Sequence, residues 1–477
     1  MLFKKTLLVI MCSSALVACG GGGGSSNGDS SSNGSGSNGG STGGGSVTTP
    51  VSDLDKAKQL IETTKAIISY YDGFQDIADN YKTPVEVINN TASDLGRAAG
   101  IVTTLAELAM EDAQGKTKQY SAAELELLLN KDAIKNQYPL GYDLKNNTLQ
   151  IQVTGSSIKV TGSADVAYWD EFKEPNAWDW DNPDWLTNKE NFIYANQAKV
   201  NVTNLVFEAP FIANQSTYNF KIANGGAIEV INAAQQKAKF SFTADSTAKL
   251  VYPVANTLEN QETLPNQASL QLKGLVFESA DVKATLSEVS SSAKTVKFSN
   301  GQSTIEQLIP SELVLKGQVS YLQEVLDLDA SIKLNNDLSK VIDISAGHET
   351  ALNFINADLA VKLSGKLKGA NATPTPFSIN VTAKRAEYLK GTANVAVAVD
   401  KNALNIEFAS QDITQEKPVV SSVIKHENGA FVQIADIKKF STADVKVGTT
   451  SYGTITKNSS EQYAVKFIDD TVVYITP

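Results

Sequence analysis

Two copies of the serine-hydrolase pattern Gly-x-Ser-x-Gly occur near the start of the chain, at residues 24–28 and 39–43. Both lie in a stretch of Gly, Ser and Asn, where composition alone generates the pattern and no strand–turn–helix can hold a nucleophile. The chain has only two histidines, His348 and His426. A glutamate stands beside each, but neither belongs to a motif that would supply the partner residues of a general base or a metal site. We therefore predict no catalytic residue.

All four tryptophans fall within residues 168–185, interleaved with carboxylates. Pro175 and Pro183 exclude a helix or a central strand there, so we predict a long loop. One interpretation is a binding tip for a sugar, a cationic ligand or a protein partner. The other, which we favour because indoles in water are costly, is a lid over one open end of a β core. The segment contains Trp169, Asp170, Glu171, Glu174, Trp178, Asp179, Trp180, Asp181, Asp184 and Trp185.

The spacing of Asp179, Asp181 and Asp184 is similar to the start of an EF-hand calcium loop. However, Pro183 occupies a ligand position, and the glycine and the distal glutamate of that loop are missing. We therefore expect no metal site, and nothing in the sequence implies a cofactor.

An apolar stretch follows Lys4 and Lys5, is too short to span a bilayer, and ends in Leu16-Val17-Ala18-Cys19. This ending resembles the lipobox of bacterial lipoproteins. The resemblance implies that residues 1–18 are a signal peptide, and that Cys19 receives diacylglycerol on its sulfur and an acyl chain on its amine. In that family Gly20, rather than aspartate, implies the outer membrane, on its periplasmic face or at the cell surface. Several acyl chains give stable anchoring.

Cysteine content and charge narrow the possible functions. Cys12 leaves with the signal peptide and Cys19 carries lipid, so the mature chain has no thiol for catalysis, redox chemistry or zinc. The formal charge of -11 becomes -13 without Lys4 and Lys5, with 39 basic residues against 52 acidic ones. Such a surface repels phosphate backbones, so we expect no nucleic-acid partner.

The remaining chain divides by composition and periodicity. Residues 19–50 comprise the lipidated cysteine and a Gly/Ser-rich tether, which spans about 30 Å as a coil and about 100 Å when extended. Residues 51–135 show apolar positions at three- and four-residue steps. Thr83-Pro84 is typical of a helix start, so we predict an antiparallel helical hairpin, and Ser121 with Glu124 indicates a capping box for a third helix.

After residue 136 the period changes to two. Alternating runs such as Leu326 to Leu334 place one face in a core and the other in water, and Asp400-Lys401-Asn402 predicts a tight hairpin turn. We predict an α+β fold, in which residues 136–430 form a large antiparallel β-meander built as a curved sheet, a sandwich or an open barrel. Residues 431–477 should form a small C-terminal β subdomain.

These features favour a non-enzymatic, lipid-anchored lipoprotein of the envelope that serves as a binding or scaffolding module. The expected partners are the membrane, through the acyl anchor, and an envelope protein, a glycan or an apolar ligand. The alternative is a carrier of a lipid or other apolar ligand, which needs a β-lined cavity of at least several hundred Å³. A polysaccharide-active enzyme that uses carboxylates is the third hypothesis.

Overall fold

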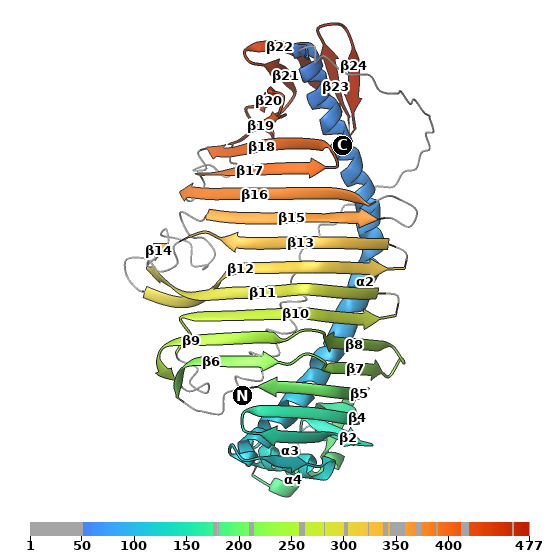
Figure 1. Cartoon of the computed structure of the whole chain (residues 1–477), viewed down its shortest axis with the longest axis vertical. Helices are drawn as coiled ribbons and strands as arrows, with labels where there is room; N and C mark the ends of the chain where they lie inside the picture. The colour runs from blue at the N-terminus through green and yellow to red at the C-terminus, as the bar shows by residue number, and fades with distance from the viewer. Residues whose placement is uncertain are drawn as a thin grey trace.

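The computed structural model describes residues 51–476, except 175–178, 180, 209–213, 257–262, 281, 300–303, 323, 337–341, 344–357, 369–373, 388–389, 412–418 and 460–461. For residues 73–93, 298–299, 304–305, 342–343, 385–387, 411 and 459 it describes the backbone but not the side chains. The chain is mostly β, with N-terminal helices followed by a long antiparallel meander, as the sequence predicts. In Figure 1 the strands lie one above another, and helix α2 runs across them along the longest axis.

Helix α2 is a single helix of 61 residues, Asp53–Ala113. Ser52 caps its start by accepting a hydrogen bond from the backbone N–H of Asp55, and Gln114 ends it in the left-handed conformation. The predicted hairpin is therefore wrong, because the helix continues through Thr83-Pro84. An interior proline costs about 3 kcal/mol of helix stability. Packing of both ends of α2 against the sheet offsets this cost, so the local stop signal does not decide the structure.

Three short helical segments follow α2. They are α3 (Ala122–Asn136), α4 (Pro183–Thr187) and the 3-10 helix η1 (Lys189–Asn191). The predicted capping box is confirmed, since Ser121 and the Glu124 side chain exchange hydrogen bonds with each other's backbone N–H groups.

The described strands form one sheet of 24 strands. The first twelve are β1 (Lys118–Tyr120), β2 (Tyr142–Lys145), β3 (Gln150–Thr154), β4 (Ser157–Phe172), β5 (Phe192–Glu208), β6 (Gln215–Ile222), β7 (Ala227–Asn232), β8 (Lys237–Phe242), β9 (Ser246–Asn256), β10 (Gln267–Ser279), β11 (Val282–Ser299) and β12 (Thr304–Tyr321). The others are β13 (Glu324–Leu334), β14 (Ile342–Asp343), β15 (Asp358–Lys368), β16 (Thr375–Glu387), β17 (Lys390–Val399), β18 (Asn402–Gln411), β19 (Val419–Lys425), β20 (Ala430–Ile434), β21 (Thr442–Val447), β22 (Thr450–Ser459), β23 (Gln462–Phe467) and β24 (Val472–Ile475).

Most neighbouring strands in the sheet are also neighbours in the sequence. From β10 to β24 each strand pairs with the next in antiparallel fashion, except that β13 pairs with β15 and the short β14 pairs in parallel with β11. Between β5 and β10, the pair β7–β8 and the pair β6–β9 lie end to end in the sheet (Figure 1). The predicted hairpin between β17 and β18 is confirmed, with Asp400 at a positive φ of 51°.

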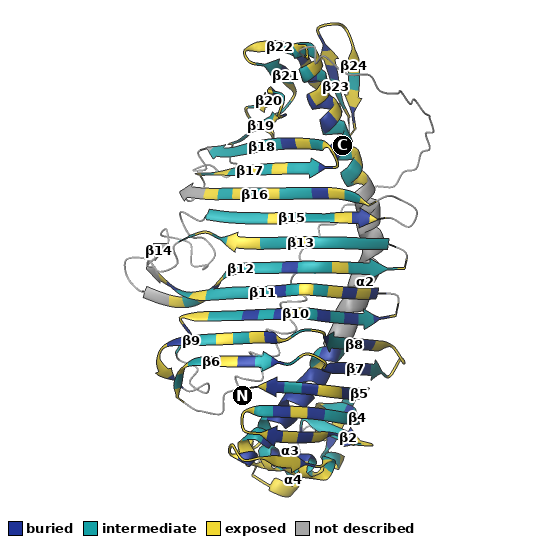
Figure 2. Ribbon diagram, in the orientation of Figure 1, coloured by how far each residue is buried: buried dark blue, intermediate teal, exposed yellow. Residues whose placement is uncertain are grey.

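Two hydrophobic cores join α2 to the sheet. The first contains the C-terminal part of α2, from Leu95 to Ala113, with α3 and the early strands up to Leu315 of β12. The second contains the N-terminal part of α2, from Ala57 to Ile67, with the later strands from Phe377 to Ile475. Figure 2 shows that buried residues concentrate in the early strands, whereas the central strands are mostly intermediate in burial.

The N-terminal end of α2 is held by the last strands of the sheet. The Lys58 ammonium lies 2.5 Å from a carboxylate oxygen of Asp469, and the Asn428 amide donates to the Lys56 carbonyl at 3.1 Å. The subdomain boundary predicted at residue 431 falls inside β20, which pairs with both β19 and β21. Strand pairing therefore runs through this position without interruption.

Candidate functional site

The sequence-predicted site residues are only partly within the described chain. Cys19, His348, Trp178 and Trp180 lie outside the described residues. Trp169 belongs to the end of strand β4, and Trp185 belongs to helix α4. The predicted long loop is thus wrong at both of its ends, because a strand reaches Phe172 and Pro183 starts a helix, where its missing N–H costs nothing.

Five rings gather at the α4 end of the sheet, and we call this cluster the aromatic tip. It consists of Trp169, Phe172, Trp185, Phe192 and Tyr194. The Phe172 centroid lies 5.4 Å from that of Trp169 and 5.7 Å from that of Trp185, and Trp185 meets Phe192 edge-on at 5.3 Å. Trp169 and Tyr194 stand opposite each other in the β4–β5 register. The Trp169 side chain remains 38% exposed, whereas Phe192 is buried.

Local hydrogen bonds position α4 against the sheet. Asn182 caps the helix by accepting from the backbone N–H groups of Asp184 and Trp185. The Leu140 backbone N–H donates to the Leu186 carbonyl, and Leu186 is itself buried. The Tyr194 hydroxyl donates to the Leu140 carbonyl at 3.0 Å. Burial, and next the charge of Asp143, raise the pKa of Tyr194 above its ordinary value, so this hydroxyl stays a donor.

A polar hollow of about 360 Å³ adjoins the aromatic tip on β2, β4 and β5. Asp143 forms an ion pair with Lys189 at 2.8 Å, and Asp165 accepts from the Asn146 amide at 2.6 Å. The hollow is lined by Asp143, Lys145, Asp165, Ala167, Tyr194, Ala195, Asn196 and Gln197.

Sequence reasoning missed this hollow. Its residues come from three strands, and the β4–β5 register shift between Val166 and Tyr168 brings them together. Asn196, which has a positive φ of 51°, stands at the same irregularity. The only local signal of this bulge is the polar pair Asn196-Gln197, which interrupts strand β5. A bulge redirects the side chains on either side of it.

The three aspartates considered for calcium, Asp179, Asp181 and Asp184, are all exposed, and Asp181 accepts a hydrogen bond from Gln137 at 3.4 Å. Among the described residues, no group of three or more His, Cys, Asp or Glu side chains is arranged to hold a metal ion. His426 is buried in a turn, where its Nδ1 accepts from the Asn428 backbone N–H at 3.1 Å.

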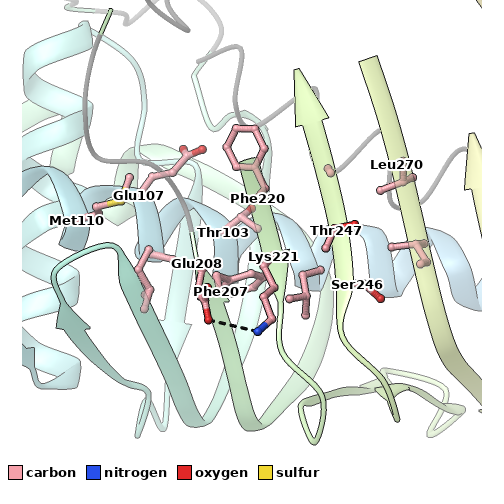
Figure 3. Close-up of a pocket in the computed structure, with 15 residues that line it drawn as sticks. Thr103, Glu107, Met110, Phe207, Glu208, Phe220, Lys221, Ser246, Thr247 and Leu270 are labelled. Atoms are coloured by element: carbon pink, nitrogen blue, oxygen red, sulfur yellow. Dashed lines mark ion pairs between the residues drawn. The ribbon is translucent and has the colours of Figure 1, made fainter. Parts of the chain in front are cut away.

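A second hollow lies between α2 and strands β5, β6, β9 and β10 (Figure 3). It is almost entirely apolar, with Met110 from the helix and Phe207, Phe220 and Leu270 from the sheet among its walls. Glu208 and Lys221 form an ion pair of 3.6 Å at its edge. The cavity measures about 30 Å³, which is room for no more than a few water molecules. It is too small for an acyl chain.

Comparison with known proteins finds no match: no family profile, no curated protein and no solved structure matches the chain. Across the part of the chain that the structure describes, no helix is both long and apolar enough to cross a membrane.

Proposed function

We propose that the protein is a lipid-anchored, non-enzymatic binding module of the bacterial cell envelope that presents its aromatic tip away from the membrane. One observation carries the proposal. The start of α2, which follows the tether, lies at the β20–β24 end of the molecule, and the aromatic tip with α4 lies at the opposite end (Figure 1).

The dimensions suit a spacer. A helix of 61 residues is about 90 Å long. The tether that precedes it adds about 30 Å as a relaxed coil. An acylated Cys19 would therefore hold the aromatic tip on the order of 100 Å from the bilayer, with free orientation.

The chemistry of the tip favours a neutral glycan. Trp169 and Tyr194 offer ring surface beside the polar hollow, where the amides of Asn196 and Gln197 supply both donors and acceptors. Aromatic rings with a polar rim suit a ligand that is apolar on one face and rich in hydroxyls at its edge. The many carboxylates between residues 170 and 190 disfavour an anionic one.

No reaction is part of this proposal. The two carboxylates in the hollow are already engaged, Asp143 by Lys189 and Lys145, and Asp165 by Asn146. A glycosidase needs a free pair, one of which is held protonated. An enclosed apolar cavity, which the carrier hypothesis requires, is not formed between α2 and β5–β10, where the hollow holds about 30 Å³.

Two measurements test the proposal. Cys19→Ser should release the protein from the membrane fraction, and unchanged partition would refute the anchor. Trp169→Ala should weaken binding of a neutral N-acetylhexosamine oligomer, measured by titration calorimetry, by about tenfold or more, because a ring contact is lost. Tyr474→Ala is the matched control, since Tyr474 is 54% exposed at the opposite end. No binding by the wild type, or equal losses in both variants, would refute the glycan site.

A further inference from the structure

The charged groups of the polar hollow balance each other only when a residue from outside its walls is counted. Asp143 and Asp165 each contribute a carboxylate to the hollow, and Lys145 contributes an ammonium. Lys189 does not line the hollow, but its ammonium lies 2.8 Å from Oδ1 of Asp143. With Lys189, two positive charges match the two negative ones. Without it, the hollow carries a net negative charge.

Lys145 lies next to both carboxylates and cannot neutralise both. It stands directly opposite Asp165 in the β2–β4 register, and its ammonium lies 3.5 Å from Oδ2 of Asp143. The Lys145 side chain is 68% exposed, so water weakens the field of its charge. Asn146 donates to Asp165 at 2.6 Å, but an amide brings no net charge. A second cation is therefore needed.

Asp143 is the carboxylate that depends most on this second cation. Its side chain is only 13% exposed, so the carboxylate is largely withdrawn from water. A carboxylate in such surroundings is costly when it is unpaired, and it attracts any cation that can reach it. The contact with Lys189 removes this attraction before a ligand arrives.

The fold holds Lys189 in place from both sides. Lys189 begins the 3-10 helix η1, which follows helix α4 directly. Helix α4 is fixed to the sheet through the buried Leu186, whose carbonyl accepts from the Leu140 backbone N–H at 3.1 Å. On the other side, η1 leads into the buried Phe192 of β5. The ion pair with Asp143 therefore forms without the cost of ordering a free loop.

We propose that Lys189 determines the charge specificity of the polar hollow, so that it binds uncharged N-acetylated sugars and rejects amino sugars that carry a free ammonium. The inference rests on the proposed glycan site and names the residue that selects its ligand. A cationic sugar would have to displace one ammonium from Asp143 and would approach a second at Lys145. An uncharged sugar leaves both ion pairs intact and can use the amides of Asn196 and Gln197.

Two oligomers that differ only in charge test the proposal. An N-acetylhexosamine oligomer and the same oligomer without its acetyl groups are titrated into the full chain by calorimetry at about pH 6, where amines are protonated and carboxylates are ionised. The wild type should prefer the acetylated oligomer. In Lys189→Met the ratio of the two dissociation constants should shift by about tenfold or more towards the amino-sugar oligomer, because one close charge pair is gained.

Lys173→Met is the matched control. Lys173 forms an ion pair with Glu190 of η1 at 3.0 Å, and neither residue lines the hollow. This variant loses the same charge and also releases one carboxylate, yet it should keep the wild-type ratio. Lys189→Arg keeps the positive charge and should stay close to the wild-type ratio as well. A purely structural role of Lys189 would weaken both oligomers equally and leave the ratio unchanged.

The outcomes separate this proposal from the glycan site itself. If the wild type binds the acetylated oligomer but Lys189→Met shifts the ratio no more than Lys173→Met does, the role of Lys189 is refuted and the glycan site is not. A wild type that prefers the amino-sugar oligomer would also refute this role. If the wild type binds neither oligomer, the glycan site is refuted. Binding of the amino-sugar oligomer by Lys189→Met alone would then still support the role of Lys189, and no binding would overturn both.

Discussion

The early and the central parts of the sheet share one sequence pattern but differ in packing. In β3–β5 the apolar positions, such as Ile151, Val160 and Val200, are completely buried against α2 and α3. In β15–β18 the equivalent positions, such as Val381 and Val395, stay half-buried. Alternation therefore specifies which face of a strand is apolar, but not whether anything covers that face.

The largest expected difference is in the free energy of unfolding of two matched isoleucine variants. Ile151→Ala should lower the free energy of unfolding by about 2–5 kcal/mol, because a fully buried side chain leaves a cavity. Ile406→Ala removes the same atoms from a half-buried site, where a loss of about 1 kcal/mol is expected. Urea denaturation measures both. Equal losses would mean that the central face is as well packed as the early one.

The aromatic tip allows the same comparison between a packed ring and an exposed one. Trp185 packs between Phe172 and Phe192, so Trp185→Ala should cost about 3 kcal/mol of stability. Trp169 is 38% exposed, and Trp169→Ala should cost about 0.5 kcal/mol. Thermal unfolding followed by circular dichroism tests this difference. A larger loss at Trp169 would make it part of a lid rather than a binding surface.

The smallest expected effect concerns the ion pair that joins the start of α2 to the last strands. The Lys58 ammonium, and next Thr471, lower the pKa of Asp469 from 3.8 to about 2. The stabilisation by this pair is therefore complete above about pH 4 and is lost as the pH falls towards 2. The melting temperature of Asp469→Asn should lie slightly below that of the wild type at pH 7, and the difference should vanish below about pH 2.

A partner substitution checks the cause of this pH dependence. Lys58→Met removes the other member of the pair, so its melting temperature should also lie slightly below that of the wild type at pH 7. As the pH falls from about 4 to about 2, the two melting temperatures should converge. The pair is exposed, so salt should also reduce both differences. A difference from the wild type that is unchanged between pH 4 and pH 2 would exclude the ion pair as its source.

Local signals predicted much of the architecture. The capping box at Ser121, the hairpin turn at Asp400 and the alternation in β13 and β15–β18 are all present as expected. Each depends on residues that are close in sequence, whose conformation is set by side chains a few positions away. The helix across Thr83-Pro84 and the strand that reaches Phe172 were not predicted, because local stop signals were outweighed by packing.

The site shows the same division. The sequence located Trp169 and Trp185, and the lipobox resemblance still stands as the prediction for Cys19. It did not find the polar hollow, whose walls depend on a register shift between β4 and β5.

By itself the sequence predicted which regions are helical or β-stranded and the polarity of each sheet face, because these depend on composition and on spacing within one element. Only the tertiary structure decided which part of the sheet α2 covers and that the aromatic tip lies opposite the start of α2. Such relations depend on residues far apart in the chain, such as Lys58 and Asp469, 411 positions apart. No local periodicity encodes a contact of that range, because it forms only when two complete surfaces meet.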